Sequence, residues 1–315
     1  MANDLDLVDQ RIITAAAIDF PIVSGLIQDI VKSGGKRMRP LLLLLAARSY
    51  DYDLERAVTA AAGIELLHTA SLVHDDSIDR AALRRGQPTL NSQLDPGAVI
   101  LIGDFLFAQS AVLAAATNEV RVVAIFARSL AEICDGQIRE TLDANRLDQD
   151  LADYDRRIHG KTAALFAGAA EMGAVIGGAP ERDVMNLKEF GKDLGMAFQI
   201  QDDILDLREG TQKLGKPAGN DIRQGVVTLP TMIYAERASE ETRTILEGIL
   251  VGDITDDVTI DDVVARIRVS GALDAAEDRA MEFVDSARAR LAAIADTETR
   301  GFLDDLLHQV INRSA

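Results

Sequence analysis

The sequence predicts an all-α protein, and that prediction depends on its composition and on the spacing of its apolar residues. Of the 315 residues, 48% are hydrophobic and 27% are charged, which is enough apolar material for a continuous core. The hydrophobic share is mostly Ala, Leu, Ile and Val, and Ala and Leu favour helix. Apolar residues recur at helical spacing almost throughout, and strand patterns are scarce. No stretch has the composition of a linker, so we expect one domain over residues 1–315.

Clusters of Gly, Pro and Asp divide the periodic pattern into separate helices. They predict breaks near Ser33–Gly35, Arg85–Pro88, Asp95–Gly97, Gly177–Pro180, Leu214–Asn220 and Asp253–Asp257. The long helices predicted between these breaks are Leu54–Val73, Ala98–Ala116, Val120–Leu142, Thr162–Ile176 and Leu187–Asp206. Gly225–Leu229 is short and leads into Pro230, so we expect it to begin a helix. Thr259 or Asp261 is expected to cap the helix that starts near residue 257.

The charge pattern excludes several classes of protein. The 33 basic and 51 acidic side chains give a formal net charge of −18, which argues against nonspecific binding to nucleic acid or to anionic membranes. The first residues, MANDLDLVDQR, are acidic where a signal peptide is basic and then apolar. The longest unbroken apolar run, Leu41–Ala47, is far short of the roughly 20 residues that span a bilayer. We therefore expect a cytoplasmic protein without a membrane span, and the single Cys134 excludes an intrachain disulfide.

Two aspartate clusters of the form DDxxD each end a mainly apolar helix. The first is Asp75–Asp79 and the second is Asp202–Asp206. Residues four apart share one face of a helix, so the first and last aspartates of each cluster point the same way. The second aspartate of each cluster is rotated by about 100° about the helix axis from the first. The candidate metal ligands are Asp75, Asp76, Asp79, Asp202, Asp203 and Asp206.

These carboxylates favour a magnesium site. Like charges at this spacing repel and lower stability unless a cation is bound. Mg²⁺ prefers oxygen ligands and commonly bridges carboxylates to substrate phosphates. A single cluster could be only a solvated acidic helix end, whereas two copies after two apolar helices favour a metal site. The chain has no Gly-centred twelve-residue EF-hand loop, and its four His and one Cys lack zinc-ligand spacing.

Basic residues are placed to receive the phosphates that such a site implies. Gly34–Pro40 opens a helix with three cations, and glycines at a helix N-terminus commonly bind phosphate. Three more basic turns follow at Arg84–Arg85, Lys161–Thr162 and Leu214–Pro217. Each basic turn alone is weak evidence for phosphate binding, because the GGK sequence lacks the spacing of a P-loop and paired arginines usually lie on a solvated surface. Two acidic clusters and four basic turns in this order are far more specific.

At these positions the chain resembles the trans-isoprenyl diphosphate synthases, the polyprenyl synthetase family. The matching stretches are GGKRMRP, LLHTASLVHDDSIDRAALRRGQPT, LIGDFLF, Lys161–Thr162, GMAFQIQDDILD and LGKPAGNDIRQGVVTLP. The resemblance implies one all-α domain, a bundle of long helices around a central cavity, normally in a homodimer. It also implies chain elongation, in which an allylic diphosphate ionises, its carbocation alkylates isopentenyl diphosphate and a proton is lost.

The resemblance implies a role for each site residue. Three Mg²⁺ ions on the allylic diphosphate would be coordinated by Asp75, Asp79 and Asp202. The bound waters and the helix ends would be supported by Asp76, Asp203 and Asp206. The same diphosphate would be bound by Arg84, Lys161 and Lys216. Isopentenyl diphosphate would be held by Lys36, Arg39, His68 and Arg85.

The carbocation needs a dry site near oxygen dipoles. By the resemblance, Thr162 and Gln199 supply the oxygens and Phe198 supplies an aromatic wall. No side chain is an obvious general base, and the released diphosphate is expected to take the proton. His74, next to the first cluster, is expected to orient a carboxylate or to face solvent. The chain has Val226 where the family often has a lysine, so we expect one diphosphate contact to be missing.

The helix before the first cluster is expected to set product length. The growing tail would run alongside it, so Ala70, Ser71 and Leu67 would form the floor of its tunnel. Short-chain members often place an aromatic ring there, and small residues leave the tunnel open, so we predict a hexaprenyl to decaprenyl product. Alternatively, Ala70 only permits close helix packing and Phe105 or Phe107 blocks the tunnel, which would give a farnesyl or geranylgeranyl product.

Three other functions stay open from the sequence. A class I terpene cyclase shares the ionisation step but does not need a second diphosphate site at Lys36, Arg39 and Arg85. A non-catalytic paralogue generally loses aspartates from one cluster, and this chain keeps all six. A catalytic subunit could require a small partner, as in some heptaprenyl synthases. The release of an apolar product also leaves room for transient membrane contact.

Overall fold

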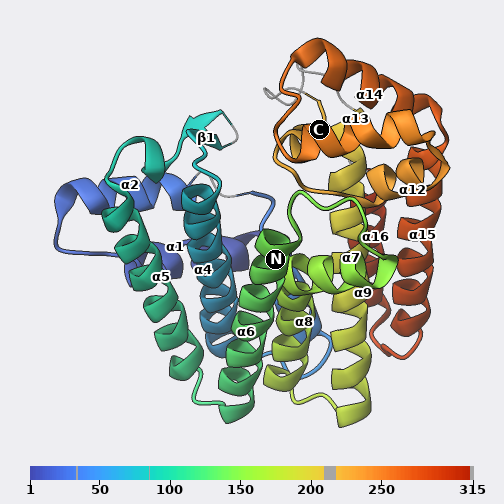
Figure 1. Ribbon diagram of the computed structural model, residues 1–315. Helices are drawn as coiled ribbons and strands as arrows, with labels where there is room; N and C mark the ends of the chain where they lie inside the picture. Colours follow the sequence, from blue (N-terminus) through green and yellow to red (C-terminus); the bar gives the residue numbers. More distant parts are fainter. Residues whose placement is uncertain (33–34, 85, 209–217, 313–315) are drawn as a thin grey trace. The chain divides into compact units, whose positions relative to one another are not determined.

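The computed structural model describes residues 1–32, 35–84, 86–208 and 218–312 (Figure 1). In chain order its elements are α1 (Ala2–Ala15), α2 (Pro21–Lys32), α3 (Met38–Arg48), α4 (Leu54–Ile78), β1 (Leu83–Arg84), β2 (Gln87–Pro88), η1 (Leu90–Ser92), α5 (Pro96–Ala116), α6 (Val120–Asp143), α7 (Leu151–Ile158), η2 (His159–Ala163), α8 (Ala164–Ile176), α9 (Glu181–Arg208), α11 (Asn220–Arg223), α12 (Leu229–Arg237), α13 (Glu240–Leu250), α14 (Asp257–Val269), α15 (Ala272–Leu291) and α16 (Thr297–Ile311). Over these ranges the only sheet is the antiparallel pair β1–β2. The predicted all-α class is confirmed.

The predicted helix boundaries are close to those observed, with two informative differences. α4 continues to Ile78, so Asp75 and Asp76 lie within the helix rather than beyond its predicted end at Val73, and Asp79 is its cap. α9 begins at Glu181, earlier than predicted, and its C-terminal part carries the second cluster, as expected. The predicted cap of α14 is wrong. The Asp256 carboxylate accepts from the Thr259 amide at 2.9 Å, so the aspartate before the helix is the cap. α12 begins at Leu229, as the run before Pro230 indicates.

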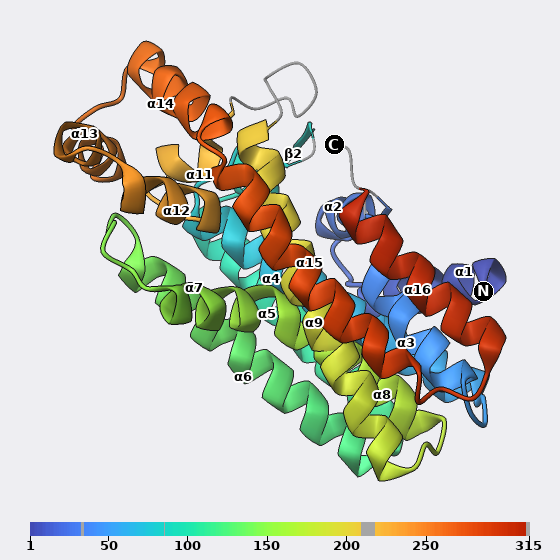
Figure 2. The same cartoon turned by 90° about the vertical axis from the view of Figure 1, so that its right-hand side faces the viewer.

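The described residues form two compact units. Unit 1 comprises Met1–Leu130, Leu165–Gly191 and Arg290–Leu303, and unit 2 comprises Ala131–Ala164, Lys192–Ala289 and Asp304–Ala315. Each unit therefore combines segments that are far apart in the chain, and the second view helps to follow them (Figure 2). The expectation of one domain over 1–315 stays a prediction.

Unit 1 is built around α4, which is buried along most of its length. α5 lies beside α4 and runs in the opposite direction, and α1 and α3 also pack on α4 (Figure 1). Gly63 permits the close approach of α5, because a Cβ there would lie 3.3 Å from both Leu113 Cβ and the Ser110 carbonyl oxygen. This packing fixes α4, and with it the aspartate cluster at its C-terminal end.

Unit 2 has its own apolar core. Its members come from α7, the C-terminal half of α9 and helices α11 to α15, and they include Tyr154, Ile200, Ile222, Leu246 and Ile267. All five are fully buried or nearly so. The second aspartate cluster lies on α9, between positions that belong to this core, so the core holds the backbone of the cluster.

Among the described helices, α5 bears on the expectation that the chain has no membrane span. α5 is 21 residues long with a mean hydropathy of 2.0, so by length and composition it could cross a bilayer. It contains no long unbroken apolar run, because Gly103–Asp104 and Gln109–Ser110 divide its apolar residues. About 39% of the 18-residue segment with this hydropathy is buried, because one side of α5 packs along α4 and the remainder is exposed.

Candidate active site

The first aspartate cluster forms the C-terminal turn of α4. Asp75 and Asp76 are within the helix, and Asp79 follows as its cap, with its amide donating to the Asp75 carbonyl oxygen at 2.8 Å. The predicted shared face of Asp75 and Asp79 is therefore present. The C-terminal end of a helix also carries partial negative charge. Carboxylates at this end raise the local negative potential further, which favours a bound cation.

Within unit 1, Arg84 on β1 neutralises part of this charge. Its Nε donates to Asp76 Oδ1 at 2.8 Å, with side-chain exposures of 39% for Arg84 and 12% for Asp76. The sequence indicated Arg84 as a diphosphate ligand and Asp76 as a supporting carboxylate, and the structure brings these two together. Arg85 lies outside the described residues.

His74 holds α4 against α5. Its Nε2 lies 3.1 Å from the Ile100 carbonyl oxygen, a hydrogen bond that requires the proton on Nε2. The ring also packs edge-on against Phe107, with ring centroids 5.2 Å apart, and Nε2 is 3.7 Å from Asp104 Oδ1. Gly103 makes room for the ring, since a Cβ there would lie 2.1 Å from Nε2. The hydrogen bond, ring contact and ion pair of His74 are thus with residues of α5.

The three cations of the predicted phosphate turn do not behave alike. Lys36 is exposed, and the Arg39 guanidinium stacks over the Phe166 ring at 4.4 Å. Arg37 instead points into unit 1, where it contacts Asp9 and Glu65 at 2.8 Å each. Arg37 was not assigned to a substrate, and two carboxylates of the protein already pair with its guanidinium.

His68 and the proposed chain-length residues lie on α4 in the turns before Asp75. Leu67 and Ala70 are fully buried, and His68 and Ser71 are half-buried. The Ser71 hydroxyl donates to the His68 carbonyl oxygen at 2.8 Å, so it is bonded within its own helix. These positions are compatible with a packed helix face.

The second aspartate cluster is held by neutral hydrogen-bond donors. Asp203 is buried, and its carboxylate accepts from the Tyr154 hydroxyl at 2.7 Å and from Gln199 Nε2 at 2.9 Å. Thr162 Oγ1 donates to Gln199 Oε1 at 2.6 Å. Burial raises the pKa of Asp203 to about 7, although these hydrogen bonds oppose the shift. Burial and the nearby Asp203 charge raise the pKa of Tyr154 well above its usual value.

The other two aspartates of this cluster differ in their surroundings. Asp206 accepts from the backbone amides of Asn220 at 3.2 Å and Asp221 at 3.1 Å, so it caps the short helix α11. Burial and the Asp206 charge raise the pKa of Asp221 well above its usual value. Asp202 is half-buried on α9. The cluster therefore combines a buried, a capping and a partly exposed carboxylate.

Lys161 and Thr162 lie in a π-helical turn, not at the start of a helix as the sequence predicts. The turn η2 joins α7 to α8 without a break, and the Ala164 amide bonds to the His159 carbonyl, five residues earlier. Lys161 Nζ forms an ion pair with Glu140 on α6. Glu140 and Tyr154 were not among the site residues that the sequence predicts. Tyr154 lies two helical turns before Lys161, a spacing that could have identified it.

Close backbone contact fixes this turn within unit 2. A Cβ on Gly136 of α6 would lie 2.3 Å from the Lys161 amide nitrogen, and one on Gly160 would lie 2.7 Å from the Glu132 carbonyl oxygen. Only glycine fits at either position without moving backbone. α6 and the turn therefore cross at these two glycines, directly beside Lys161.

The remaining predicted residues come from α9 and from the part of the chain that follows it. Phe198 is half-buried on α9, next to Gln199. Val226 follows α11, and its amide bonds to the Asp221 carbonyl oxygen at 2.8 Å. Lys216 lies outside the described residues. No group of three or more His, Cys, Asp or Glu side chains close enough to hold a metal occurs in the part of the chain that the structure describes.

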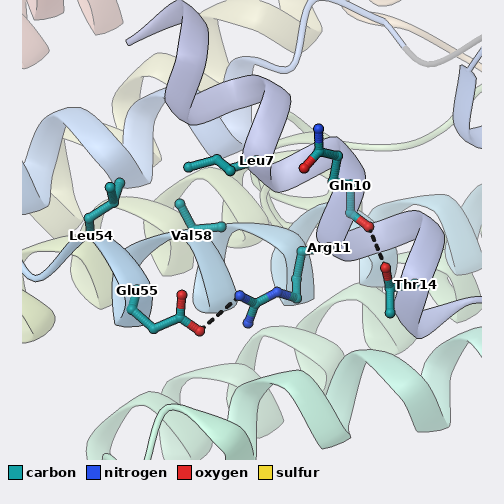
Figure 3. Close-up of a pocket in the computed structure, with 7 residues that line it drawn as sticks. All are labelled: Leu7, Gln10, Arg11, Thr14, Leu54, Glu55 and Val58. Atoms are coloured by element: carbon teal, nitrogen blue, oxygen red, sulfur yellow. Dashed lines mark hydrogen bonds and ion pairs between the residues drawn. The ribbon is translucent and has the colours of Figure 1, made fainter.

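A pocket of about 380 Å³ lies elsewhere, between α1 and the first turns of α4 (Figure 3). An ion pair between Arg11 and Glu55, at 2.8 Å, crosses it. The residues that line it are Leu7, Gln10, Arg11, Thr14, Leu54, Glu55 and Val58. It includes no predicted site residue and lies at the opposite end of α4 from the first aspartate cluster.

Comparison with known proteins identifies the chain's relatives. Residues 20–267 match the family model described as polyprenyl synthetase. The chain belongs to the polyprenyl synthetase family. It is 39% identical over 306 residues to "heptaprenyl diphosphate synthase component 2" of Geobacillus stearothermophilus, covering 97% of this chain and 94% of that protein. It is therefore an enzyme of the transferase class, with trans-prenyltransferase activity.

Solved structures agree with this assignment. A decaprenyl diphosphate synthase from Rhodobacter capsulatus is similar with a TM-score of 0.93 and 36% identity, covering 100% of this chain and 97% of that one. A polyprenyl synthase from Caulobacter crescentus, complexed with calcium and isoprenyl diphosphate, is similar with a TM-score of 0.95 and 34% identity, covering 100% and 96%. Prenyl synthases of this family generally use Mg²⁺.

Proposed function

We propose that this polyprenyl synthetase condenses isopentenyl diphosphate with an allylic diphosphate to make an all-trans hexaprenyl to decaprenyl diphosphate. The two complete aspartate clusters carry the proposal, because a subunit without catalytic function has no need for all six carboxylates. The similarity to heptaprenyl and decaprenyl synthases over nearly the whole chain supports the product class.

The carboxylates suit Mg²⁺ in number and chemistry. All are hard oxygen donors at the C-terminal parts of two helices, where negative charge accumulates. In the proposed site Asp75, Asp79 and Asp202 hold three Mg²⁺ ions. Asp203 and Asp206 keep their bonds to protein groups, and Asp76 supports the site beside Arg84. When bound, Mg²⁺ supplies positive charge that offsets the charge developing on the leaving diphosphate.

The side chains of this enzyme then have distinct tasks in the reaction. Arg84, Lys161 and Lys216 bind the allylic diphosphate and stabilise it as its C–O bond breaks and the electron pair stays on oxygen. The double bond of isopentenyl diphosphate attacks the carbocation and forms the new C–C bond. The proton lost from the adjacent carbon goes to the released diphosphate.

The carbocation and the second substrate are held by other residues. The oxygens of Thr162 and Gln199, already aligned by their 2.6 Å hydrogen bond, lie beside the carbocation, with Phe198 as an aromatic wall. Lys36, Arg39, His68 and Arg85 bind the diphosphate of isopentenyl diphosphate. The stacking of Arg39 on Phe166 restricts its guanidinium before the substrate arrives.

Product length follows from the small side chains on α4. Ala70 is buried, and Phe there would fill space that the growing tail needs. Ala70→Phe is expected to shorten the main product by several isoprene units, with Leu67 and Ser71 as the neighbouring positions. Reverse-phase chromatography of the dephosphorylated products measures this. Unchanged lengths would remove the assignment of Ala70.

A homodimer is the proposed assembly, formed through α5. This helix exposes Ile100, Leu101 and Val112, and Leu101 is 69% exposed, which suits a surface that a second copy covers. Light scattering is expected to give twice 34.0 kDa, and Leu101→Glu is expected to reduce it to a monomer. Because one relative is named as a component 2, a partner-dependent enzyme is the alternative. Activity of the purified chain alone separates the two.

The enzyme is proposed to act in the cytoplasm, with no nucleic-acid partner and only transient membrane contact when the apolar product is released. Vesicle co-sedimentation with and without product present tests the membrane contact. Binding without product would contradict the transient mode.

The decisive experiment is product analysis with purified enzyme, Mg²⁺ and radiolabelled isopentenyl diphosphate. Dimethylallyl, farnesyl and geranylgeranyl diphosphates serve as separate primers. We expect incorporation only with a primer, and products of hexaprenyl to decaprenyl length. Cyclic products formed from a primer alone would indicate a terpene cyclase, and farnesyl or geranylgeranyl end products would indicate a short-chain synthase.

A further inference from the structure

Arg37 has an unusual position for a residue in a phosphate-binding turn. It immediately precedes α3 with φ 51° and ψ 37°, a left-handed conformation that a non-glycine residue seldom adopts. Its side chain is only 11% exposed. A conformation of this kind persists only where the surrounding structure holds it.

Three helices of unit 1 hold the Arg37 side chain. Nε donates to Asp9 Oδ1 of α1 at 2.8 Å, and one terminal nitrogen donates to Glu65 Oε1 of α4, also at 2.8 Å. The other terminal nitrogen donates to the Val31 carbonyl oxygen of α2 at 2.5 Å. Every nitrogen of the guanidinium donates a hydrogen bond within the protein, so Arg37 has no pair of unused nitrogens with which to bind a phosphate.

The charges around Arg37 are also matched. Glu65 is 6% exposed, and a carboxylate so deeply buried requires a paired cation. Asp9 is 42% exposed and adds a second, more hydrated partner. The Arg37–Glu65 contact is therefore the buried centre of this arrangement, and the Arg37–Asp9 contact is its outer part.

Arg37 and Glu65 lie beside the residues proposed to bind isopentenyl diphosphate. Lys36 precedes Arg37 directly, and Arg39 follows it by two residues at the start of α3. Glu65 lies one helical turn before His68 on α4. A single guanidinium thus links the backbone that carries Lys36 and Arg39 to the helix that carries His68.

We propose that Arg37 is a positioning residue for isopentenyl diphosphate. It contacts no substrate itself. By holding the turn in its left-handed conformation and tying it to Glu65, it fixes where Lys36 and Arg39 stand relative to His68. This inference rests on the proposed function, since it presupposes that those three residues bind that substrate.

The test measures the KM of each substrate separately. Arg37→Met keeps an unbranched apolar stem and removes the guanidinium with its hydrogen bonds. We expect the KM for isopentenyl diphosphate to rise at least tenfold, while the KM for the allylic substrate stays within twofold and kcat within threefold. Asp9→Asn removes one charge at a partly exposed position and is expected to raise the same KM about threefold.

Arg56→Met is the matched control. Arg56 also lies on unit 1 and also ties a helix to backbone, because its Nε donates to the Thr117 carbonyl oxygen at 2.9 Å. It lies at the other end of α4 from the predicted site. Thermal unfolding is expected to show a lower Tm for both arginine variants, but only Arg37→Met is expected to change the KM for isopentenyl diphosphate.

The outcomes separate this inference from the proposed function. If Lys36→Ala raises the KM for isopentenyl diphosphate and Arg37→Met does not, the positioning role is overturned and the proposed function stands. Equal rises in both KM values would also overturn it, because they indicate a general loss of structure. If Arg37→Met does not fold, an unchanged KM in Asp9→Asn overturns it. If the wild-type enzyme uses no isopentenyl diphosphate, both proposals are wrong.

Discussion

The two aspartate clusters have the same sequence pattern but different local chemistry. On α4, Asp76 is paired with the Arg84 guanidinium, and both side chains have some access to solvent. On α9, Asp203 is buried and accepts from two neutral donors, Tyr154 and Gln199. One cluster is balanced by a cation and the other by a neutral hydrogen-bond network.

This difference indicates different roles in the proposed reaction. Ion pairs that solvent reaches contribute little, about 0–1 kcal/mol, and only the Arg84 end of this pair is well exposed, at 39%, while Asp76 is buried. Arg84 can therefore leave Asp76 for a diphosphate more readily than a fully buried donor could. Breaking a buried network costs more, because a donor or acceptor then loses its partner without regaining water. We therefore interpret the first cluster as adjustable and the second as organised before substrate binds.

The largest expected effect is shared by both clusters. Asp75→Ala and Asp202→Ala should each lower kcat/KM by about 1,000-fold, or about 4 kcal/mol, since each removes a proposed metal ligand. Steady-state incorporation assays measure this. Asp278→Ala, at an exposed position on α15, gives the same charge change as a control. A loss of less than about tenfold (about 1.4 kcal/mol) at either aspartate would contradict the metal assignment.

The next largest effect is expected on the free energy of unfolding, when two glycines are each replaced by alanine. Gly136→Ala should lower the free energy of unfolding by about 3 kcal/mol, because its Cβ meets the Lys161 backbone. Gly103→Ala should cost about 1 kcal/mol, because its Cβ meets the His74 side chain, which can rotate. Urea unfolding measures both. Gly301→Ala on α16, where a Cβ meets nothing within 4 Å, is expected to be neutral or slightly stabilising. Equal costs at Gly136 and Gly103 would show that the two regions are equally rigid.

Tyr154→Phe probes the buried network directly. It leaves one oxygen of Asp203 without its donor and should lower the free energy of unfolding by about 2 kcal/mol. Turnover should also fall, because the Asp203–Gln199–Thr162 chain loses one anchor. Urea unfolding and kcat are measured on the same preparations. A variant with unchanged stability and unchanged kcat would show that the second cluster does not depend on this hydroxyl.

The smallest effect is expected at the exchangeable ion pair. Arg84→Met should lower the free energy of unfolding by about 1 kcal/mol, since Arg84 is 39% exposed and solvent screens its end of the pair, although Asp76 is buried. The difference in free energy of unfolding between the wild type and Arg84→Met should become smaller as salt is added, because salt screens the ion pair. Unfolding at low and high NaCl measures this. A cost that exceeds that of Tyr154→Phe would reverse the proposed ranking of the two clusters.

The sequence predicted those features that are determined locally. The helical spacing of apolar residues identified α4, α5 and α9, and the DDxxD spacing placed Asp75 and Asp79 on one face. The contacts of Arg37 and Tyr154 could not be predicted in this way. Their partners lie 28 and 49 residues away, and only the packing of helices brings them together. The cap of α14 was missed because several acidic residues in succession offered equivalent candidates.

The π-helical turn before α8 has a consequence for insertions and deletions. Over His159–Ala163 the hydrogen bonds span one residue more than in an α-helix. Deleting one residue here would restore ordinary spacing and rotate α7, with Tyr154, by about 100° about the helix axis relative to Thr162. The hydroxyl would then swing away from the carboxylate that it now binds. The count of residues between Tyr154 and Thr162 is therefore as restrictive as their identity, and homologous enzymes that differ in length should avoid differing here.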